Sequence, residues 1–194
     1  MRLVINLLLL AIIGALAYML YFGIQEPIAF NTAKTARLDA VTSKLKEIRK
    51  AQEAYRGITG KYAHSFDTLN HVLKNDSFLI VKIIGDPDDP TSGNFVRTEN
   101  YVMAADSMRS LGLFDKLDDF ANVPFSDGEV FELMADTLTY QKTLVNVVEC
   151  RTRYRTFMGD YADPKYAKYD NTYDPSNFVK FGDMSAPNLG GNWE

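Results

Sequence analysis

The residue types that most often bind metals or transfer protons are few in this sequence and widely spaced. His64 and His71 are the only histidines, and Asp67 lies between them. Two imidazoles and a carboxylate can hold a metal ion, but zinc sites usually have more ligands at closer spacing. We therefore expect no metal site at these three residues.

Two acidic stretches could supply oxygen ligands to a calcium ion. Their carboxylates are Asp86, Asp88 and Asp89 in the first stretch, and Asp160, Asp163, Asp170 and Asp174 in the second. Neither stretch has the central glycine and terminal glutamate of an EF-hand loop. We interpret both as solvent-exposed turns.

Three arginines and the single cysteine lie close together in the sequence. Arg151, Arg153 and Arg155 alternate with other residues, which in a strand would place all three on one face. That face could bind an anion or an acidic partner, but we favour the simpler interpretation that it offsets the carboxylates of the same chain. Cys150 follows the apolar run of residues 144–148, so we expect a buried small side chain without reactivity.

Short motifs with a known catalytic mechanism are missing. The sequence has no phosphate-binding loop, no dinucleotide-binding glycine pattern, no H-E-x-x-H, no C-x-x-C and no G-x-S-x-G. Nothing singles out a pair of carboxylates for acid–base catalysis. We therefore predict that the protein is not an enzyme and needs no cofactor.

The element that positions all these residues is the first one in the chain. Residues 3–24 are apolar except for one asparagine, and as a helix they are roughly 33 Å long, enough to cross a bilayer. The Ala-Leu-Ala sequence at 15–17 resembles a signal-peptidase site, but the apolar run continues to Phe22, so we predict an uncleaved single-pass anchor. The residues that represent this membrane anchor are Leu3, Asn6, Leu10, Ile13, Leu16, Leu20 and Ile24.

An amphipathic helix is predicted to follow from Asn31 to Arg56. Its apolar side chains recur at spacings of three, four and seven, and charged residues lie off this stripe. The stripe, which we expect to pack on the head or on other subunits, is Leu38, Val41, Leu45, Ile48 and Tyr55. Proline at position 27 predicts an interruption or kink, and Gly57 and Gly60 predict the end of the helix.

The remaining chain is predicted to form a soluble head. We expect a short helix over 66–74 capped by Ser65, short helical or irregular structure over 106–125, and strands over 78–84, 129–140, 143–157 and 178–181. The predicted fold is α+β. A transmembrane anchor (1–26) continues into an amphipathic stem helix (27–58), which packs on a small, mainly antiparallel β-sheet head (59–194).

The region 159–177 has many Asp, Tyr, Pro and Asn residues and few aliphatic ones, which predicts a surface loop. Aromatic side chains here and at the C-terminus could bind a partner: Tyr161, Tyr166, Tyr169, Tyr173 and Trp193. For Trp193 we favour packing onto the head, because large aromatic side chains are usually buried.

Charge is distributed unevenly between stem and head. Residues 1–61 carry nine Lys and Arg against four Asp and Glu, whereas residues 62–194 carry twelve against twenty-one. The acidic head argues against a nucleic-acid partner, because phosphate binding needs clustered basic side chains. We interpret the basic stem as a solvated face close to anionic lipid headgroups.

The order of anchor, amphipathic helix and helix exit resembles a known group of proteins. The sequences 46–55 and 60–69, the Val-Pro-Phe sequence at 123–125 and the ending 191–194 resemble uncharacterised membrane-anchored envelope proteins of Bacteroidetes. More distantly, the A-x-x-A-Y…G-x-Y helix exit resembles type IV pilins and the pseudopilins of type II secretion. Those proteins carry Glu at the fifth mature position, whereas this chain has Ile5.

The resemblance implies an N-terminus in the cytoplasm and a head in the periplasm. The expected function is a pilin-like structural or assembly subunit of a secretion or pilus-like complex, anchored in the bacterial inner membrane. The expected partners are membrane lipid, other envelope-complex proteins and further copies of the chain, but no nucleic acid. The alternatives are a membrane-tethered periplasmic binding module for a protein or glycan and, as the weakest, a tethered hydrolase.

Overall fold

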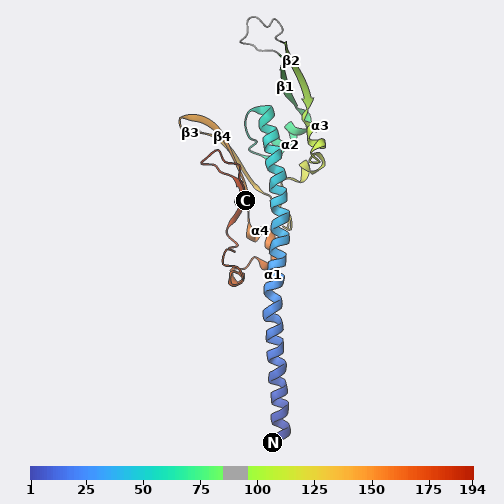
Figure 1. Ribbon diagram of the computed structural model, residues 1–194, viewed down its shortest axis with the longest axis vertical. Coiled ribbons are helices and arrows are strands. Elements are labelled where there is room, and N and C mark those ends of the chain that lie inside the picture. Colours follow the sequence, from blue (N-terminus) through green and yellow to red (C-terminus); the bar gives the residue numbers. More distant parts are fainter. Residues whose placement is uncertain (85–95) are drawn as a thin grey trace.

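One long helix organises the whole molecule. The computed structural model describes residues 1–84 and 96–194. Helix α1 (Arg2–Thr59) has 58 residues and is therefore about 87 Å long. Its first half projects away from the other elements, and its second half lies among them (Figure 1).

Helix α1 is less interrupted than predicted. Pro27 lies inside it and the helix continues on both sides, so the interruption expected at 25–27 is wrong. Proline removes one hydrogen bond, and the helix-favouring residues on either side outweigh this loss. Gly57 also stays within the helix, where a Cβ would lie 3.3 Å from the ring of Phe78. Gly60 ends the helix as predicted, with a φ of 78° that favours glycine.

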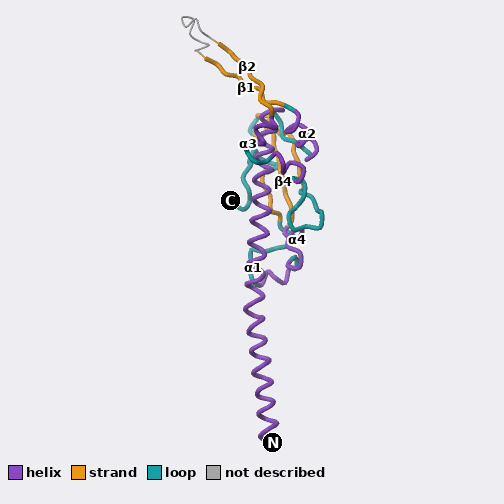
Figure 2. The backbone as a smooth tube through the Cα atoms, turned by 90° about the vertical axis from the view of Figure 1, so that its right-hand side faces the viewer, coloured by secondary structure: helices purple, strands orange, loops and turns teal. Residues whose placement is uncertain are grey.

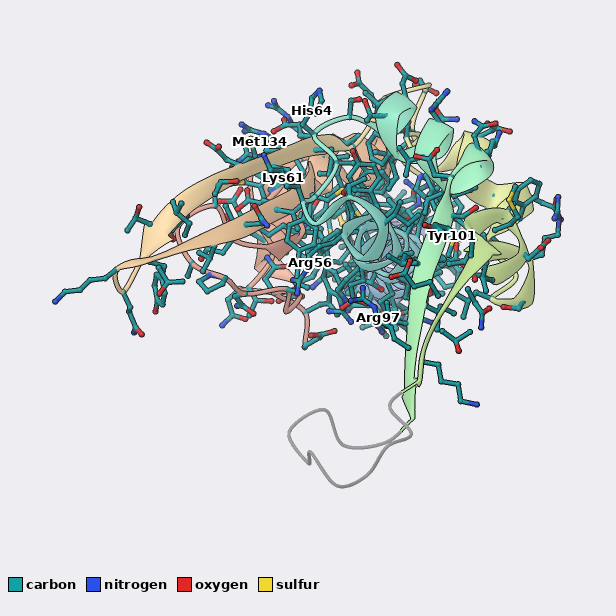
Figure 3. All side chains as sticks on the ribbon, turned by 90° about the horizontal axis from the view of Figure 1, so that it is seen from above. Arg56, Lys61, His64, Arg97, Tyr101 and Met134 are labelled. Carbon is teal, nitrogen blue, oxygen red and sulfur yellow. The ribbon has the colours of Figure 1, made fainter. Side chains whose placement is uncertain are left out.

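Two small antiparallel sheets lie on different sides of α1, as the view along the helix shows (Figure 3). The first is a hairpin of β1 (Ser77–Ile84) and β2 (Val96–Met103), which extends beyond the end of α1 (Figure 2). The second has the order β3 (Glu132–Tyr140), β4 (Thr143–Arg153) and β5 (Phe178–Gly182). The predicted α+β fold is confirmed.

Short helices connect the strands. They are α2 (Phe66–Asn75), α3 (Ala104–Ser110), η1 (Phe114–Asp119), α4 (Tyr154–Met158), η2 (Gly159–Tyr161) and η3 (Pro164–Lys168). Ser65 caps α2 as predicted, because its hydroxyl oxygen accepts a hydrogen bond from the Thr68 N–H at 3.3 Å.

Strand β4 ends earlier than predicted. The chain turns into α4 at Tyr154, so the strand expected over 143–157 is wrong beyond Arg153. The backbone N–H groups of residues 154 and 155 donate to the carbonyls of Asn177 and Pro175, at 3.1 and 3.0 Å. These hydrogen bonds take the place of strand pairing beyond Arg153, because residues 175–177 lie against this turn.

The core lies between the second half of α1 and the head. Fully buried side chains come from α1, α2, β4, α4 and β5, among them Ile48, Leu69, Val148, Phe157 and Phe181. Burying each such side chain contributes roughly 1.5–3 kcal/mol. The stem is therefore the central element of the head core.

Candidate interaction surfaces

The first half of α1 is an apolar surface that the rest of the chain leaves uncovered. Every residue of 3–24, and so every predicted anchor residue, is exposed. The most apolar 18-residue window of α1 has a mean hydropathy of 2.6, and none of it is buried. By length and composition this segment can cross a membrane once.

The predicted stripe of the stem faces the head of the same chain. Val41, Leu45 and Ile48 are fully buried, Tyr55 is 8% exposed, and Leu38 is half-buried against the core. The stripe is therefore buried in the core of its own chain. Contacts between copies of the protein would have to use another surface.

The basic stem pairs with the acidic head. Lys34 binds Asp170, the Lys44 ammonium lies 2.6 Å from the Asp119 carboxylate, and Arg49 lies 2.9 Å from Glu194. All three basic side chains are at most 24% exposed. The interpretation of a wholly solvated basic face is thus wrong for these residues, since their charges fix α1 to the head.

The ion pair between Lys34 and Asp170 also changes the ionisation of the Asp170 carboxyl group. Its carboxylate binds the Lys34 ammonium and accepts hydrogen bonds from the backbone N–H and hydroxyl of Thr172. These contacts stabilise the ionised form and lower the pKa of Asp170 to about 2.

The tyrosine-rich region was predicted to be a surface loop. This prediction is wrong, because the region packs on α1. Four tyrosine rings surround Phe30, with centroid distances of 5.1–6.2 Å: Tyr161, Tyr166, Tyr169 and Tyr173. Tyr166 and Tyr173 are buried, and the other two are half-buried. Their rings form an aromatic cluster that fastens residues 159–173 to the stem, so deletion of this region would open the core.

The three arginines line one pocket of about 420 Å³, but they do not lie on one strand as predicted. Arg155 lies on α4, because the strand has already ended. Arg151 and Arg153 both contact the ring of Phe178, at 4.4 and 4.6 Å from its centroid. Arg151 also pairs with Glu132 and with the buried Glu149, at 2.7 and 3.1 Å. Arg151 therefore offsets carboxylates of its own sheet.

The other candidates for chemistry lie apart. His64 and His71 are exposed, and Figure 3 shows His64 at the surface. Within residues 1–84 and 96–194, no group of three or more His, Cys, Asp or Glu side chains could hold a metal ion. Cys150 is fully buried, and burial raises the pKa of its thiol.

The acidic stretches differ in what the structure describes. Asp163, Asp170 and Asp174 each accept a hydrogen bond from the backbone N–H two residues later, which is the geometry of an Asx turn. Asp163 and Asp174 are exposed turn residues, as predicted, whereas Asp170 is half-buried and paired with Lys34. Asp86, Asp88 and Asp89 lie outside the described residues.

The hairpin carries a second exposed apolar face. Leu79, Val81, Tyr101 and Met103 share one side of the β1–β2 pair and are 38–72% exposed. At its base, Phe78 packs close to Gly57 of α1. The face lies at the opposite end of the molecule from the first half of α1 (Figure 2).

Trp193 packs back onto the head as predicted. The indole is half-buried against the core and lies directly on Gly191, where a Cβ would be 2.4 Å from the ring. Only glycine permits this approach, so the chain end is held in place.

No protein-family model, curated protein or solved structure matches this chain. The resemblance to pilin-like proteins thus stays a hypothesis.

Sequence reasoning missed Phe30 as the centre of the aromatic cluster. It lies just before the amphipathic stretch predicted from Asn31, and its partners are more than 130 residues later in the chain. A signal was available: Phe30 precedes Leu38 by eight residues and so extends the same helical stripe.

Proposed function

We propose that this protein is a pilin-like structural or assembly subunit of a bacterial cell-envelope complex, with no catalytic activity of its own. The observation that supports this most is the continuity of α1. One helix has an uncovered apolar half and a second half that is the centre of the head. In a subunit built this way, contacts between the apolar halves of neighbouring copies would directly determine where each head lies.

Lipid alone would cover most of the apolar half, but Asn6 favours contacts between copies. Its amide has no hydrogen-bond partner among the described residues, and the side chains one helical turn away are Leu3, Leu9 and Leu10 together with Arg2. A polar side chain in hydrocarbon is stabilised by a hydrogen bond to a neighbouring helix. Packing of equivalent helices would supply that partner.

The location in the inner membrane and the periplasmic head belong to the same proposal. They rest on the resemblance to pilin-like proteins, in which the N-terminus stays on the cytoplasmic side. The head would then be held by its stem outside the membrane, within reach of other envelope proteins.

Cysteine cross-linking in native membranes tests the assembly proposal. The background is Cys150→Ala, and single cysteines replace residues 5–16 in turn. We expect cross-linked dimers at positions that recur every three to four residues, because one face of α1 meets another copy. Ser110→Cys, exposed on the head, is the control for random collision. Equal, weak cross-linking at every position would contradict the proposal and indicate a lipid-covered tether.

A further inference from the structure

A groove lies where α1, α4, β5 and the C-terminal segment meet. Its volume is about 590 Å³, within the range of roughly 300–1,000 Å³ for small-molecule sites. Residues that line it include Lys34, Leu38, Tyr154, Asn177, Phe178 and Trp193. They come from four separate segments, so the groove exists only in the folded head.

The groove has aromatic walls that are held in place. Tyr154, Phe178 and Trp193 are each half-buried and line it together. The ring of Tyr154 packs on Tyr173, with centroids 5.7 Å apart, and Trp193 is seated on the backbone of Gly191. Fixed aromatic rings offer flat apolar surfaces to a ligand.

Polar groups without partners accompany these rings. The Asn177 amide and the Tyr154 hydroxyl make no hydrogen bond to the part of the chain that the structure describes. The Trp193 indole N–H is buried and has no acceptor there either. Because the indole N–H is buried, the groups that a ligand in the groove can reach are the exposed Asn177 amide and the half-buried Tyr154 hydroxyl.

The groove is electrically neutral. Lys34 is the one charged residue that lines it, and its ammonium already pairs with Asp170. An anionic ligand would have to compete with that carboxylate, and a cationic ligand would find no carboxylate among the lining residues. The lining of the groove therefore favours an uncharged ligand.

Peptide binding by strand addition is blocked beside the groove. The outer edge of β5 is already occupied: the Lys180 N–H donates to the Asn192 side chain, and the Asn192 N–H donates to the Lys180 carbonyl, both at 3.0 Å. The Gly182 N–H donates to Gly190 at 3.1 Å. A ligand must be recognised by side chains instead of by pairing with this strand.

We propose that this groove binds a neutral saccharide. A sugar ring has an apolar face of C–H groups that fits an aromatic wall, and its hydroxyl groups match the Asn177 amide and the Tyr154 hydroxyl. Lys34 lies ten residues beyond Ile24, so the groove is about 15 Å along α1 from the end of the apolar run. The saccharide would thus be bound close to the membrane.

The only tryptophan of the chain lines the groove and reports binding directly. The full chain in phosphatidylcholine nanodiscs, which contain no sugar headgroup, is titrated with neutral gluco-, malto- and chito-oligosaccharides. We expect at least one series to shift the Trp193 emission saturably. Sedimentation of the protein together with an insoluble glycan would identify a wall polymer as the ligand. Binding to nanodiscs that contain a neutral glycolipid would identify a lipid-linked sugar.

Asn177→Ala is the decisive variant, because this exposed side chain makes no bond that the fold needs. We expect about tenfold weaker saccharide binding from the loss of one or two hydrogen bonds. Asn100→Ala, exposed on the hairpin, is the matched control and should bind like the parent. Absence of any emission shift across the three series, or equal affinity of both variants, would overturn the proposal. Either result leaves the cross-linking test of assembly unaffected.

Discussion

Gln52 is a polar residue on the apolar stripe of the stem, and its environment explains it. The side chain is fully buried. Its amide nitrogen donates to the Ala63 carbonyl at 3.0 Å, and its oxygen accepts from the Ala63 N–H at 2.9 Å. Gln52 thus satisfies both backbone hydrogen-bonding groups of Ala63, in the segment that follows α1. From the sequence pattern alone, Gln52 was only a break in the apolar stripe.

Replacing Gln52 should therefore destabilise the head strongly. Gln52→Met keeps the volume but leaves the Ala63 N–H and carbonyl buried without partners, at an expected loss of about 2–4 kcal/mol. Urea unfolding in detergent, followed by circular dichroism, measures this change. Gln25→Met, on the exposed part of α1, should change the free energy of unfolding by less than about 0.5 kcal/mol. Similar effects of both substitutions would contradict the role given to Gln52.

Asp170 gives the head a defined pH dependence. Its pKa is about 2 in the folded protein and about 3.9 in an unfolded chain, so its contribution is present above about pH 4 and is lost as the pH falls towards 2. Asp170→Asn should lower the free energy of unfolding by about 1–2 kcal/mol at pH 7, discounted for partial exposure of the pair. At pH 2.5 most of this difference should be gone. An equal difference at both pH values would show that charge is not the cause.

At the scale of elements, the end of β5 depends on one glycine. Gly182 has a φ of 81°, and a Cβ there would lie 1.9 Å from the Val148 carbonyl oxygen. Gly182→Ala should cost more than about 3 kcal/mol, because β4 and β5 must separate. Gly128 also has a positive φ of 84° but faces open space, so Gly128→Ala should cost only about 1–2 kcal/mol. Thermal unfolding compares the two variants, and equal losses would contradict the steric argument.

The sequence predicted elements well where one local pattern dominated. The stripe of α1 was identified by its helical period, the start of α2 by its Ser65 cap, and β5 by a short β-favouring run. Pro27 led to the wrong prediction of a break in the helix. Proline removes one helical hydrogen bond, but long helical segments on both sides keep the helix continuous.

Contacts between distant segments could not be predicted in the same way. Phe30 and Tyr166 stack with centroids 5.2 Å apart, although the sequence gives no sign that they meet. Arg155 left the predicted sheet because residues 175–177 return to bond with the turn after β4. The groove lined by Lys34 and Trp193 likewise combines four segments, and of its residues only Leu38 and Trp193 had been singled out from the sequence.

At the scale of the whole molecule, α1 combines an exposed apolar half, long enough to cross a membrane, with the central element of the head core. Its second half is fixed to the head by the buried stripe, by the aromatic cluster around Phe30 and by ion pairs such as Lys34–Asp170. Its first half has no covering from the chain. What surrounds the apolar half therefore distinguishes the two main functional hypotheses. If only lipid surrounds it, the protein is a membrane-tethered module, and if other copies surround it, the protein is a subunit of an assembly.

The distance between equivalent helices tests this central claim most directly. A spin label at Leu16→Cys, in the Cys150→Ala background, is measured in native membranes by double electron–electron resonance. Assembly through α1 predicts a defined distance between labels on neighbouring copies that persists when added lipid dilutes the protein. A signal without any defined distance, or one that vanishes on dilution, would contradict assembly and leave a monomeric tether.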